Sequence, residues 1–381
     1  MDEVKRLDAD EKKLSRKLWK RIFTEDSEEF LDYYYSFKCA ENIIYAVSRE
    51  EQLVSMLQCN KYLLNASGST VEADYIVGVA TDERFRHQGL MSELIKKALA
   101  DMYNKGRAFT FLMPAAEAIY IPFGFRFIYE QPVSVQKAAE LLPVKAAELY
   151  ISSHKRLKAE VRPLDKSDFK YAADVINRKL NEGYDIYTLK SEKYLEDLKR
   201  QYISDGGDIC CVYYGGKPEA YFTYWITENV AEIPEFICIG ADKERLAGFA
   251  ADYLYDKYRI QKIKIRGEVL DGSYYEKRIM ARITNVNSML ALMCSDKKMV
   301  IRINITDKLI AGNNGEFLWK IDGEKSEAAY DLKDNGEVPD CELKLTIEEL
   351  TEWLFGGCCP PGNEKLKSIK TLSKVFINEI V

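Results

Sequence analysis

Hydrophobic and polar positions in residues 1–132 alternate between stretches with the spacing of helices and stretches typical of strands. The clearest helical pattern covers residues 89–103, where apolar residues from Leu90 to Met102 recur at three- and four-residue spacing. A strand at 107–113 is expected after it. Ahead of it, the pattern predicts helices at 10–22 and 30–37 and strands at 42–47, 52–60, 62–66 and 71–81, with polar turns between them.

The turn between the last of these strands and the helix carries the most specific chemistry. Residues 77–91 read Val-Gly-Val-Ala-Thr-Asp-Glu-Arg-Phe-Arg-His-Gln-Gly-Leu-Met, an apolar strand that runs into a basic turn. A helix start presents unpaired N–H groups, Gly89 allows close approach, and Arg84, Arg86 and His87 add positive charge. The Arg-x-x-Gly spacing matches neither a dinucleotide fold nor a P-loop, so coenzyme A is the leading candidate ligand.

Composition narrows the function classes. The chain has 55 Lys and Arg against 61 Asp and Glu, a net charge of −6, which implies no general affinity for nucleic acid or anionic membranes and mildly favours a cationic substrate. No stretch approaches the roughly 18 apolar residues of a membrane span, and no Cys-x-x-Cys indicates a zinc site. We therefore expect a cytoplasmic protein with reduced cysteines, no metal, no nucleic-acid partner and no membrane partner.

Residues 161–282 repeat the order of the first lobe more weakly, after a connector at 133–160 of mixed charge. Arg245 and Gly248 superficially repeat the Arg-x-x-Gly spacing. Asp242 is a good helix cap, however, so both residues would lie inside the helix with their N–H groups committed. We interpret this region as a degenerate lobe that shapes the substrate site. Strands are expected at 208–214, 218–226, 231–240 and 261–267, and the helix at 243–257.

The last section, residues 283–381, is predicted to form an α+β module. Thr346 followed by Glu349 three residues later is the pattern of a capping box, and a glycine pair ends the predicted helix at 347–355. Strands are expected at 298–305, 315–322, 327–332 and 341–345.

A second chemical segment follows the predicted helix of the first lobe. Residues 109–125, Phe-Thr-Phe-Leu-Met-Pro-Ala-Ala-Glu-Ala-Ile-Tyr-Ile-Pro-Phe-Gly-Phe, are typical of a strand, a short helix and a strand. Together with Arg86-His-Gln-Gly89, this segment resembles the GNAT superfamily of acetyltransferases, whose signature is a strand followed by Arg/Gln-x-x-Gly-x-Gly/Ala. Met91 replaces the usual second small residue, and His87-Gln88 replaces a more basic turn.

A narrower resemblance spans nearly the whole chain. Val79-Ala-Thr81, Glu117 to Phe125 and Met280-Ala-Arg-Ile-Thr-Asn-Val resemble the Eis-like N-acetyltransferases. This resemblance implies an α+β fold of tandem GNAT-type lobes, with mixed sheets flanked by helices, followed by a sterol-carrier-protein-like domain. It also implies a homo-oligomer, a hexamer. The expected parts are a catalytic lobe at 1–132, a connector at 133–160, a degenerate lobe at 161–282 and a last domain at 283–381 that delivers the C-terminus.

The GNAT resemblance implies acetyl-CoA as co-substrate, held along the splay between the strands at 71–81 and 107–113 and on the turn before the helix. A backbone N–H there would stabilise the developing oxyanion of the thioester. The residues implied are Val79, Ala80, Thr81, Arg84, Arg86, His87, Gln88, Gly89, Leu90, Met91, Ser92, Ala115 and Ala116.

Acetyl transfer also needs an acid and a base. Tyr120 occupies the position of the superfamily's acid tyrosine, and a phenol that titrates near about 10 is protonated at neutral pH. The alternative is that Tyr120 is an ordinary core aromatic. For the base, the Eis-like resemblance implies the chain's own C-terminal carboxylate, that of Val381; the alternative is a frayed chain end.

Acidic side chains are candidates for holding a cationic acceptor, and we assign this role to Asp26, Glu117 and Glu379. Asp26 has an alternative role as a helix cap, and Glu117 as a solvated surface residue. The resulting hypothesis is an acetyl-CoA-dependent N-acetyltransferase that acts on primary amines of an aminoglycoside, a polyamine or a lysine side chain. The competing hypothesis is a regulatory protein that senses acyl-CoA or carries an apolar ligand without turnover.

Overall fold

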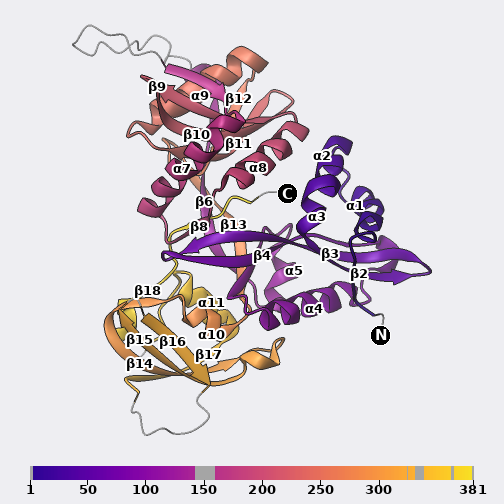
Figure 1. Cartoon of the computed structure of the whole chain (residues 1–381), viewed down its shortest axis with the longest axis vertical. Coiled ribbons are helices and arrows are strands. Elements are labelled where there is room, and N and C mark those ends of the chain that lie inside the picture. Colours follow the sequence, from indigo (N-terminus) through magenta and orange to yellow (C-terminus); the bar gives the residue numbers. More distant parts are fainter. Residues whose placement is uncertain (1–2, 142–158, 324, 331–338, 362–363, 380–381) are drawn as a thin grey trace.

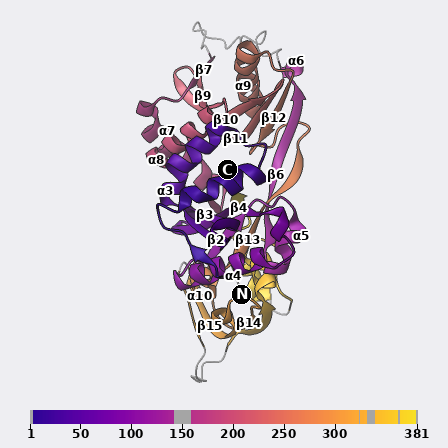
Figure 2. The same cartoon turned by 90° about the vertical axis from the view of Figure 1, so that its right-hand side faces the viewer.

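The computed structural model describes residues 3–141, 159–323, 325–330, 339–361 and 364–379. The described residues form one 14-stranded mixed sheet, which passes through two lobes, and a separate five-stranded sheet near the end of the chain. The second lobe, the first lobe and the last domain follow one another along the long axis of the molecule (Figures 1 and 2). The predicted fold class, tandem lobes of sheets flanked by helices plus a last α+β domain, is confirmed.

Helices cover both faces of the sheet in the first lobe. Short helices from the start of the chain pack on one face around Trp19, and one long helix packs on the other face through Leu94 and Leu99. The helical elements are η1 (Lys12–Ser15), α1 (Arg16–Ile22), α2 (Glu28–Tyr33), η2 (Tyr34–Lys38), α3 (Cys39–Glu41), η3 (Glu83–Phe85), α4 (Leu90–Asn104), α5 (Glu117–Tyr120), η4 (Ile121–Phe123) and α6 (Ala138–Leu141). The strands are β1 (Lys5–Arg6), β2 (Ile43–Arg49), β3 (Gln52–Ala66), β4 (Ser69–Thr81), β5 (Phe109–Leu112) and β6 (Arg126–Lys137).

The second lobe has the same alternation, with α7 and α8 on one face of its strands and α9 on the other. Asp242 caps α9 as predicted, because its carboxylate accepts the Arg245 N–H at 3.1 Å. The elements are β7 (Ala159–Pro163), η6 (Lys166–Asp168), α7 (Phe169–Gly183), β8 (Ile186–Thr188), α8 (Glu192–Ser204), β9 (Asp208–Tyr214), β10 (Lys217–Thr227), β11 (Val230–Cys238), α9 (Lys243–Tyr258), β12 (Lys262–Arg266) and β13 (Tyr274–Ile283).

The two lobes share strands. The sheet runs β1-β2-β3-β4-β5-β13-β6-β12-β11-β10-β9-β7, so β13 of the later segment lies between β5 and β6. Met280 of β13 faces Leu112 of β5 on one side and Phe127 of β6 on the other. The sheet of the first lobe is therefore completed by residues more than 140 positions away in sequence.

The last domain packs α10 and α11 against its own sheet, of order β16-β15-β14-β17, with β18 beside β14. The predicted capping box of α11 is present, since Thr346 and Glu349 exchange hydrogen bonds. The elements are α10 (Val286–Leu290), β14 (Cys294–Thr306), η7 (Ala311–Asn313), β15 (Gly315–Gly323), β16 (Lys325–Tyr330), β17 (Cys341–Thr346), α11 (Ile347–Leu354), η8 (Glu364–Ser368), β18 (Ile369–Lys370) and β19 (Val375–Phe376).

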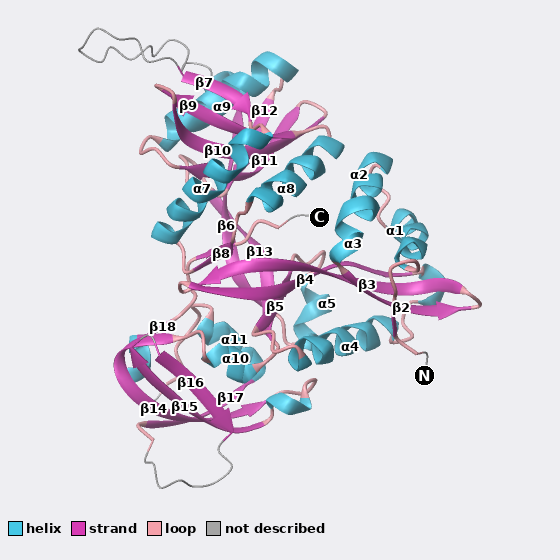
Figure 3. Ribbon diagram, in the orientation of Figure 1, coloured by secondary structure: helices cyan, strands magenta, loops and turns pink. Residues whose placement is uncertain are grey.

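One predicted break in the sheet is wrong. The turn expected between 52–60 and 62–66 is absent, because β3 continues through Lys61 and pairs with β4 along its length (Figure 3). Lys61 is an exposed position of a strand whose neighbours Asn60 and Tyr62 are buried. No helix among the described residues is long and apolar enough to cross a membrane.

Candidate active site

The turn from β4 to α4 contains two residues with positive φ, one on each side of Gln88. Asp82 caps η3 by accepting the Arg84 N–H at 3.1 Å. The chain then passes through positive φ at His87 (60°) and at Gly89 (81°), and α4 begins at Leu90. No side chain caps α4 at Gly89. The turn therefore leads the chain into α4 and leaves the N-terminus of this helix without a side-chain cap.

The amide groups at this helix start are free. The first amide of α4 that forms a hydrogen bond within the protein is that of Glu93, which donates to the Gly89 carbonyl at 3.2 Å. Within the described part of the chain, the N–H groups of residues 87–92 meet no acceptor. A Cβ added at Gly89 would find no atom within 4 Å. The helix dipole and the bare amides thus face open space, the arrangement that binds phosphate groups.

The basic residues of the turn differ in how far they are already engaged. Arg84 pairs with Asp82 at 3.0 Å, and this contact, with Arg21 at 2.7 Å, holds the pKa of Asp82 down to about 2. Arg86 donates to the Thr81 carbonyl at 3.3 Å and stays 47% exposed. Both arginines are therefore paired within the loop: Arg84 is held closely by Asp82, and Arg86 lies 3.7 Å from the Glu83 carboxylate.

One cation near the turn was missed by sequence reasoning. Arg49, at the end of β2, donates to the Gln88 side chain at 2.7 Å and lies over the Phe85 ring at 5.1 Å. Arg49 is 40 residues away from Gly89 along the chain, so no local motif indicates that the two lie close together. His87 and Gln88 are exposed beside it, while Met91 and Ser92 are partly buried on the first turn of α4.

The predicted splay between two parallel strands is present. β4 and β5 pair only at Asp74 with Thr110 and at Tyr75 with Phe111. Beyond this point β4 also bulges, because two of its residues, Gly78 and Val79, face a single residue of β3. Only glycine fits the bulge: at φ 57°, a Cβ at Gly78 would lie 2.5 Å from the Trp19 ring.

The splay has a chemical consequence for the end of β4. The edge of residues 79–81 that faces β5 has no strand partner in the described residues, so backbone groups there other than the Ala80 and Thr81 carbonyls, which accept from Ser55 and Arg86, are available to an extended ligand. Ala115 and Ala116 are exposed after the end of β5, on the other side of the splay. The unpaired edge of residues 79–81 and the free amides at the start of α4 lie at the same end of β4.

Tyr120 is the last residue of α5 and is 7% exposed. Its ring meets the Phe125 ring edge-on at 6.0 Å, and burial raises the pKa of its hydroxyl to about 12. Among the described residues, this hydroxyl has no hydrogen-bond partner. Tyr120 is therefore a core residue, as the alternative interpretation held, and also carries a protonated hydroxyl available to a ligand.

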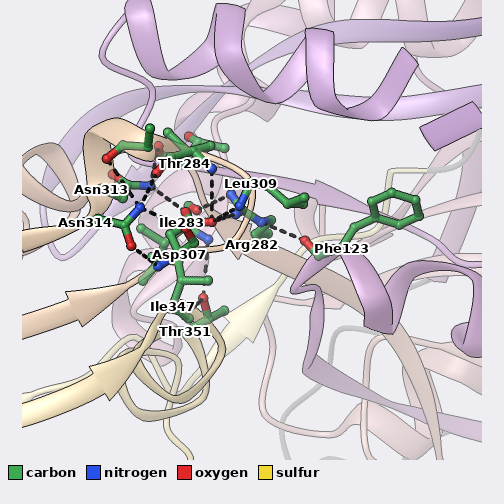
Figure 4. A network of polar contacts seen from close by, with 12 residues as sticks. Phe123, Arg282, Ile283, Thr284, Asp307, Leu309, Asn313, Asn314, Ile347 and Thr351 are labelled. Carbon is green, nitrogen blue, oxygen red and sulfur yellow. Dashed lines mark hydrogen bonds and ion pairs between the residues drawn. The ribbon is translucent and has the colours of Figure 1, made fainter. Parts of the chain in front are cut away.

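A buried ion pair fixes the segment that carries Tyr120 (Figure 4). Arg282 of β13 donates to the Phe123 carbonyl at 2.7 Å and to Asp307 of the last domain at 2.6 Å. Asp307 also accepts from Asn313 at 2.9 Å and from the amide of Leu309 at 2.9 Å. The motif that contains Arg282 indicates no role for this residue. Its partners lie in two other parts of the chain, which no local pattern reveals.

The tail of the chain returns to the junction of the lobes. β19 pairs in parallel with β8, with Val375 beside Ile186. Three residues past β19, Glu379 is 3% exposed, and its carboxylate accepts the Tyr194 hydroxyl at 3.1 Å. The tail is packed through Glu379, as its apolar composition predicted. Val381, the predicted base, lies outside the described residues.

The other predicted acidic residues lie in different places. Asp26 accepts the Trp19 indole N–H at 2.6 Å, and burial raises its pKa. It does not cap α2, because Ser27 does. Glu117 is exposed and lines a cavity of about 1480 Å³ between the lobes and the last domain, which neither Asp26 nor Glu379 lines.

A further carboxylate near Asp26 was not predicted. Asp205 follows α8 in the second lobe. Desolvation, together with the negative charge of Asp26, raises the pKa of Asp205 to about 6. Both residues remain accessible to solvent. Two carboxylates from different lobes thus act on each other, which concentrates negative charge where the lobes meet.

Comparison with known proteins gives two domain matches. A model described as an acetyltransferase (GNAT) domain matches residues 3–128, and one described as a sterol carrier protein domain matches residues 289–378. No curated protein sequence matches the chain.

Solved structures share the fold over nearly the full length. A probable N-acyltransferase from Enterococcus faecalis V583 is 20% identical, with a TM-score of 0.75 over 93% of this chain and 90% of that one. A GCN5-related N-acetyltransferase from Anabaena variabilis is 16% identical, with a TM-score of 0.71 over 97% and 94%. Eis1 from Mycobacterium abscessus is 12% identical, with a TM-score of 0.67 over 100% of both chains. Residues 3–128 therefore belong to the acetyltransferase (GNAT) domain family and residues 289–378 to the sterol carrier protein domain family, in a chain that shares its fold with these solved structures.

Proposed function

We propose that this enzyme transfers an acetyl group from acetyl-CoA to a primary amine of a cationic acceptor by direct attack. The observation that carries the proposal is the row of unpartnered amides at residues 87–92, which lies at the end of the same strand that splays from β5. A diphosphate on the amides and a pantetheine arm along Val79 to Thr81 would bring the thioester into the splay. Bound acetyl-CoA supplies the acyl group and a thiolate leaving group.

Tyr120 is proposed as the acid. Its pKa of about 12 keeps the hydroxyl protonated across the working range, and that hydroxyl is not committed to another protein group in the described chain. It can therefore donate a proton to the departing sulfur. The Arg282 contact to the Phe123 carbonyl holds this segment from behind, so the acid has a fixed position.

The base is proposed to be the terminal carboxylate of Val381. An alkylammonium with a pKa of about 10.4 must lose its proton, which costs roughly 4 to 5 kcal/mol at pH 7. The support for this assignment is the packing of the tail: Glu379, two residues before the end, is buried between the lobes.

The acceptor class follows from charge at the junction. The charge of Asp26 in the first lobe raises the pKa of Asp205 in the second, and Glu379 lies on the tail. We propose that a polyamine, an aminoglycoside or a lysine side chain is drawn in by these carboxylates, with Glu117 contributing from the separate cavity at most indirectly. A homo-oligomer, by analogy a hexamer, is the proposed assembly.

The test is release of free thiol from acetyl-CoA with kanamycin, spermidine or a lysine peptide as acceptor. Thiol release that depends on the acceptor, and that falls at least about 100-fold in Tyr120→Phe while coenzyme A binding stays unchanged, supports the proposal. Tight binding of acetyl-CoA with no turnover on any amine would instead identify a sensor. Unchanged turnover in Tyr120→Phe would remove the tyrosine from the mechanism.

A further inference from the structure

The splay between β4 and β5 has a closed inner end. The two strands pair only at Asp74 with Thr110 and at Tyr75 with Phe111, and they separate beyond this point. The start of α4, which offers the seat for a diphosphate, lies at the other, open end of the splay. A pantetheine arm that runs from the diphosphate along residues 79–81 therefore carries its thioester toward Tyr75 and Phe111.

Three aromatic rings fill this inner end on the face of the sheet away from α4. The Tyr75 ring stacks on the Phe111 ring with centroids 5.2 Å apart, and the Tyr62 ring of β3 meets these two rings at 6.1 and 6.2 Å. Tyr75 is 2% exposed, and Phe111 is fully buried. We call Tyr62, Tyr75 and Phe111 the aromatic cluster. At these separations the rings are in contact, so the cluster is packed rather than hollow.

The aromatic cluster is supported by residues around it. The Tyr194 ring of α8 meets the Tyr62 ring at 6.5 Å, and the Lys38 ammonium lies 5.2 Å from the centre of the same ring. On the other face of the sheet, Ile76 and Leu112 are buried together with the apolar side chains of α4. The inner end of the splay is therefore packed on both faces of the sheet.

The distance from the thioester to the aromatic cluster is short. With the thioester at the bulge of Gly78 and Val79, three strand residues of about 3.3 Å each separate it from Tyr75, and the ring fills part of this length. The proposed acid lies within electrostatic reach: burial is the main cause that raises the pKa of the Tyr75 hydroxyl, and the charges of Glu379 and Tyr120 raise it further. The reacting end of the arm thus has space for a short acyl chain only.

We infer that the aromatic cluster limits the length of the acyl group that the enzyme accepts: acetyl and propionyl groups fit between the thioester and the rings, and a hexanoyl group does not. This inference rests on the proposed function, because it takes the diphosphate seat and the arm along residues 79–81 from there. It goes further by naming the side chains that select the acyl-CoA. Tyr75 and Phe111 stand at the end of the splay, and Tyr62 supports them.

The test compares Phe111→Ala with Phe109→Ala in the full-length enzyme. Both phenylalanines are buried in β5 and lie on the same face of the sheet, so both substitutions remove the same volume from the same core. Only Phe111 stands at the inner end of the splay, since Phe109 lies two residues earlier and meets the Phe355 ring at 5.3 Å. Phe109→Ala is therefore the matched control.

Selectivity is measured as kcat/KM for hexanoyl-CoA divided by kcat/KM for acetyl-CoA, with one amine acceptor. We expect this ratio to lie below about 1 in 100 in the wild type and in Phe109→Ala, because each methylene beyond the length of an apolar pocket costs about 10-fold or more. The ratio should rise at least about 10-fold in Phe111→Ala. A general loss of folded enzyme cancels in the ratio. Phe111→Leu removes less volume and should shift the ratio in the same direction by less, so it replaces the alanine variant if that variant does not fold.

Binding gives a second readout that needs no turnover. In calorimetry, hexanoyl-CoA should bind to the wild type and to Phe109→Ala at least about 10-fold more weakly than acetyl-CoA. In Phe111→Ala the two affinities should become nearly equal, because the space vacated by the ring receives the longer chain. Coenzyme A without an acyl group should bind equally to all three proteins.

Two results would overturn the inference. One is a wild-type enzyme that uses or binds hexanoyl-CoA as well as acetyl-CoA. The other is a selectivity ratio that does not change in Phe111→Ala or Phe111→Leu, or that changes equally in the same substitution at Phe109. Failure of the proposed function is recognised separately, by the absence of thiol release from any acyl-CoA with any amine. The comparison of acyl-CoA affinities still decides the length limit in that case.

Discussion

The two lobes contain the same strand-to-helix crossover with opposite outcomes at the turn. In the first lobe, β4 leads into α4 through Gly89, which has no side chain to cap the helix, and the first amides stay free. In the second lobe, β11 leads into α9 through Asp242, whose carboxylate takes the Arg245 amide at 3.1 Å. An Arg-x-x-Gly spacing occurs in both. The residue at the cap position decides whether a helix N-terminus can receive a phosphate.

The surroundings of the two turns reinforce this difference. β4 separates from β5 after two paired residues, whereas β11 stays paired with β12 over four. A Cβ at Gly89 would meet no atom within 4 Å; one at Gly267, just past β12, would lie 3.0 Å from the Phe236 carbonyl and 3.5 Å from the Phe376 ring. Protein atoms thus lie against the end of β12, whereas none lies against Gly89; Ala241 and Lys243, at the start of α9, line the cavity between the lobes and the last domain.

The largest effect is expected from the residue that only the first lobe has. Residues 267–273, between β12 and β13, contain no helix, whereas the first lobe places Tyr120 on α5. Tyr120→Phe should lower kcat about 100- to 10,000-fold, because the thiolate would leave without a proton donor. Steady-state kinetics together with calorimetric coenzyme A binding check this. An alkaline fall in kcat below pH 11 that is lost in Tyr120→Phe would contradict the pKa of about 12.

Copying the cap of the second lobe into the first should abolish much of the cofactor affinity. In Gly89→Asp, the carboxylate would compete for the free amides of α4 and repel the diphosphate, and the left-handed backbone would add strain. We expect coenzyme A to bind about 100-fold more weakly by calorimetry. Affinity within twofold of the wild type would mean that the amide row does not bind the cofactor.

The charge at the junction predicts a smaller, pH-dependent effect. Asp205 is protonated below its pKa of about 6 and ionised above it, so a polycation should bind more tightly as the pH rises from 5 to 7. The amine stays charged over this range, since its pKa is about 10.4. Spermidine Kd values measured without acetyl-CoA should fall several-fold in the wild type and stay nearly constant in Asp205→Asn. An unchanged pH dependence in that variant would exclude Asp205.

The smallest effect is expected from removing the cap of the second lobe. Asp242→Ala should destabilise the protein by about 1 kcal/mol, seen as a shift of a few degrees in Tm. It should leave coenzyme A stoichiometry and affinity unchanged, because the substitution does not alter the turn at Gly89 in the first lobe. A second binding event in calorimetry would show that the cap alone had closed a cofactor site.

Local patterns predicted much of this architecture. The cap of α9, the capping box of α11 and the open start of α4 are each specified by a few adjacent residues, and all three agree with the structure. The helices α7 and α8 carry amphipathic patterns that the sequence analysis left unassigned, and the single strand β3 was divided at Lys61. There, the pairing with β4 outweighs the polar residue.

The parts that could not be predicted depend on contacts between distant residues. Nothing local indicates that β13 lies between β5 and β6, that Arg49 reaches Gln88, or that the charge of Asp26 raises the pKa of Asp205. The same holds for Tyr194 and Glu379, which are 185 positions apart. Of the site, the turn and Tyr120 were found because they form continuous motifs; the groups that support them come from other elements.

The most direct measurement is amide hydrogen exchange of both turns with and without coenzyme A, followed by mass spectrometry. The amides of residues 87–92 have no acceptor in the described chain, so they should exchange quickly in the free enzyme and slow markedly when the cofactor binds. The amides of residues 242–248 should not change. Unaltered exchange at 87–92 in the saturated enzyme, or protection at 242–248 instead, would contradict the central claim.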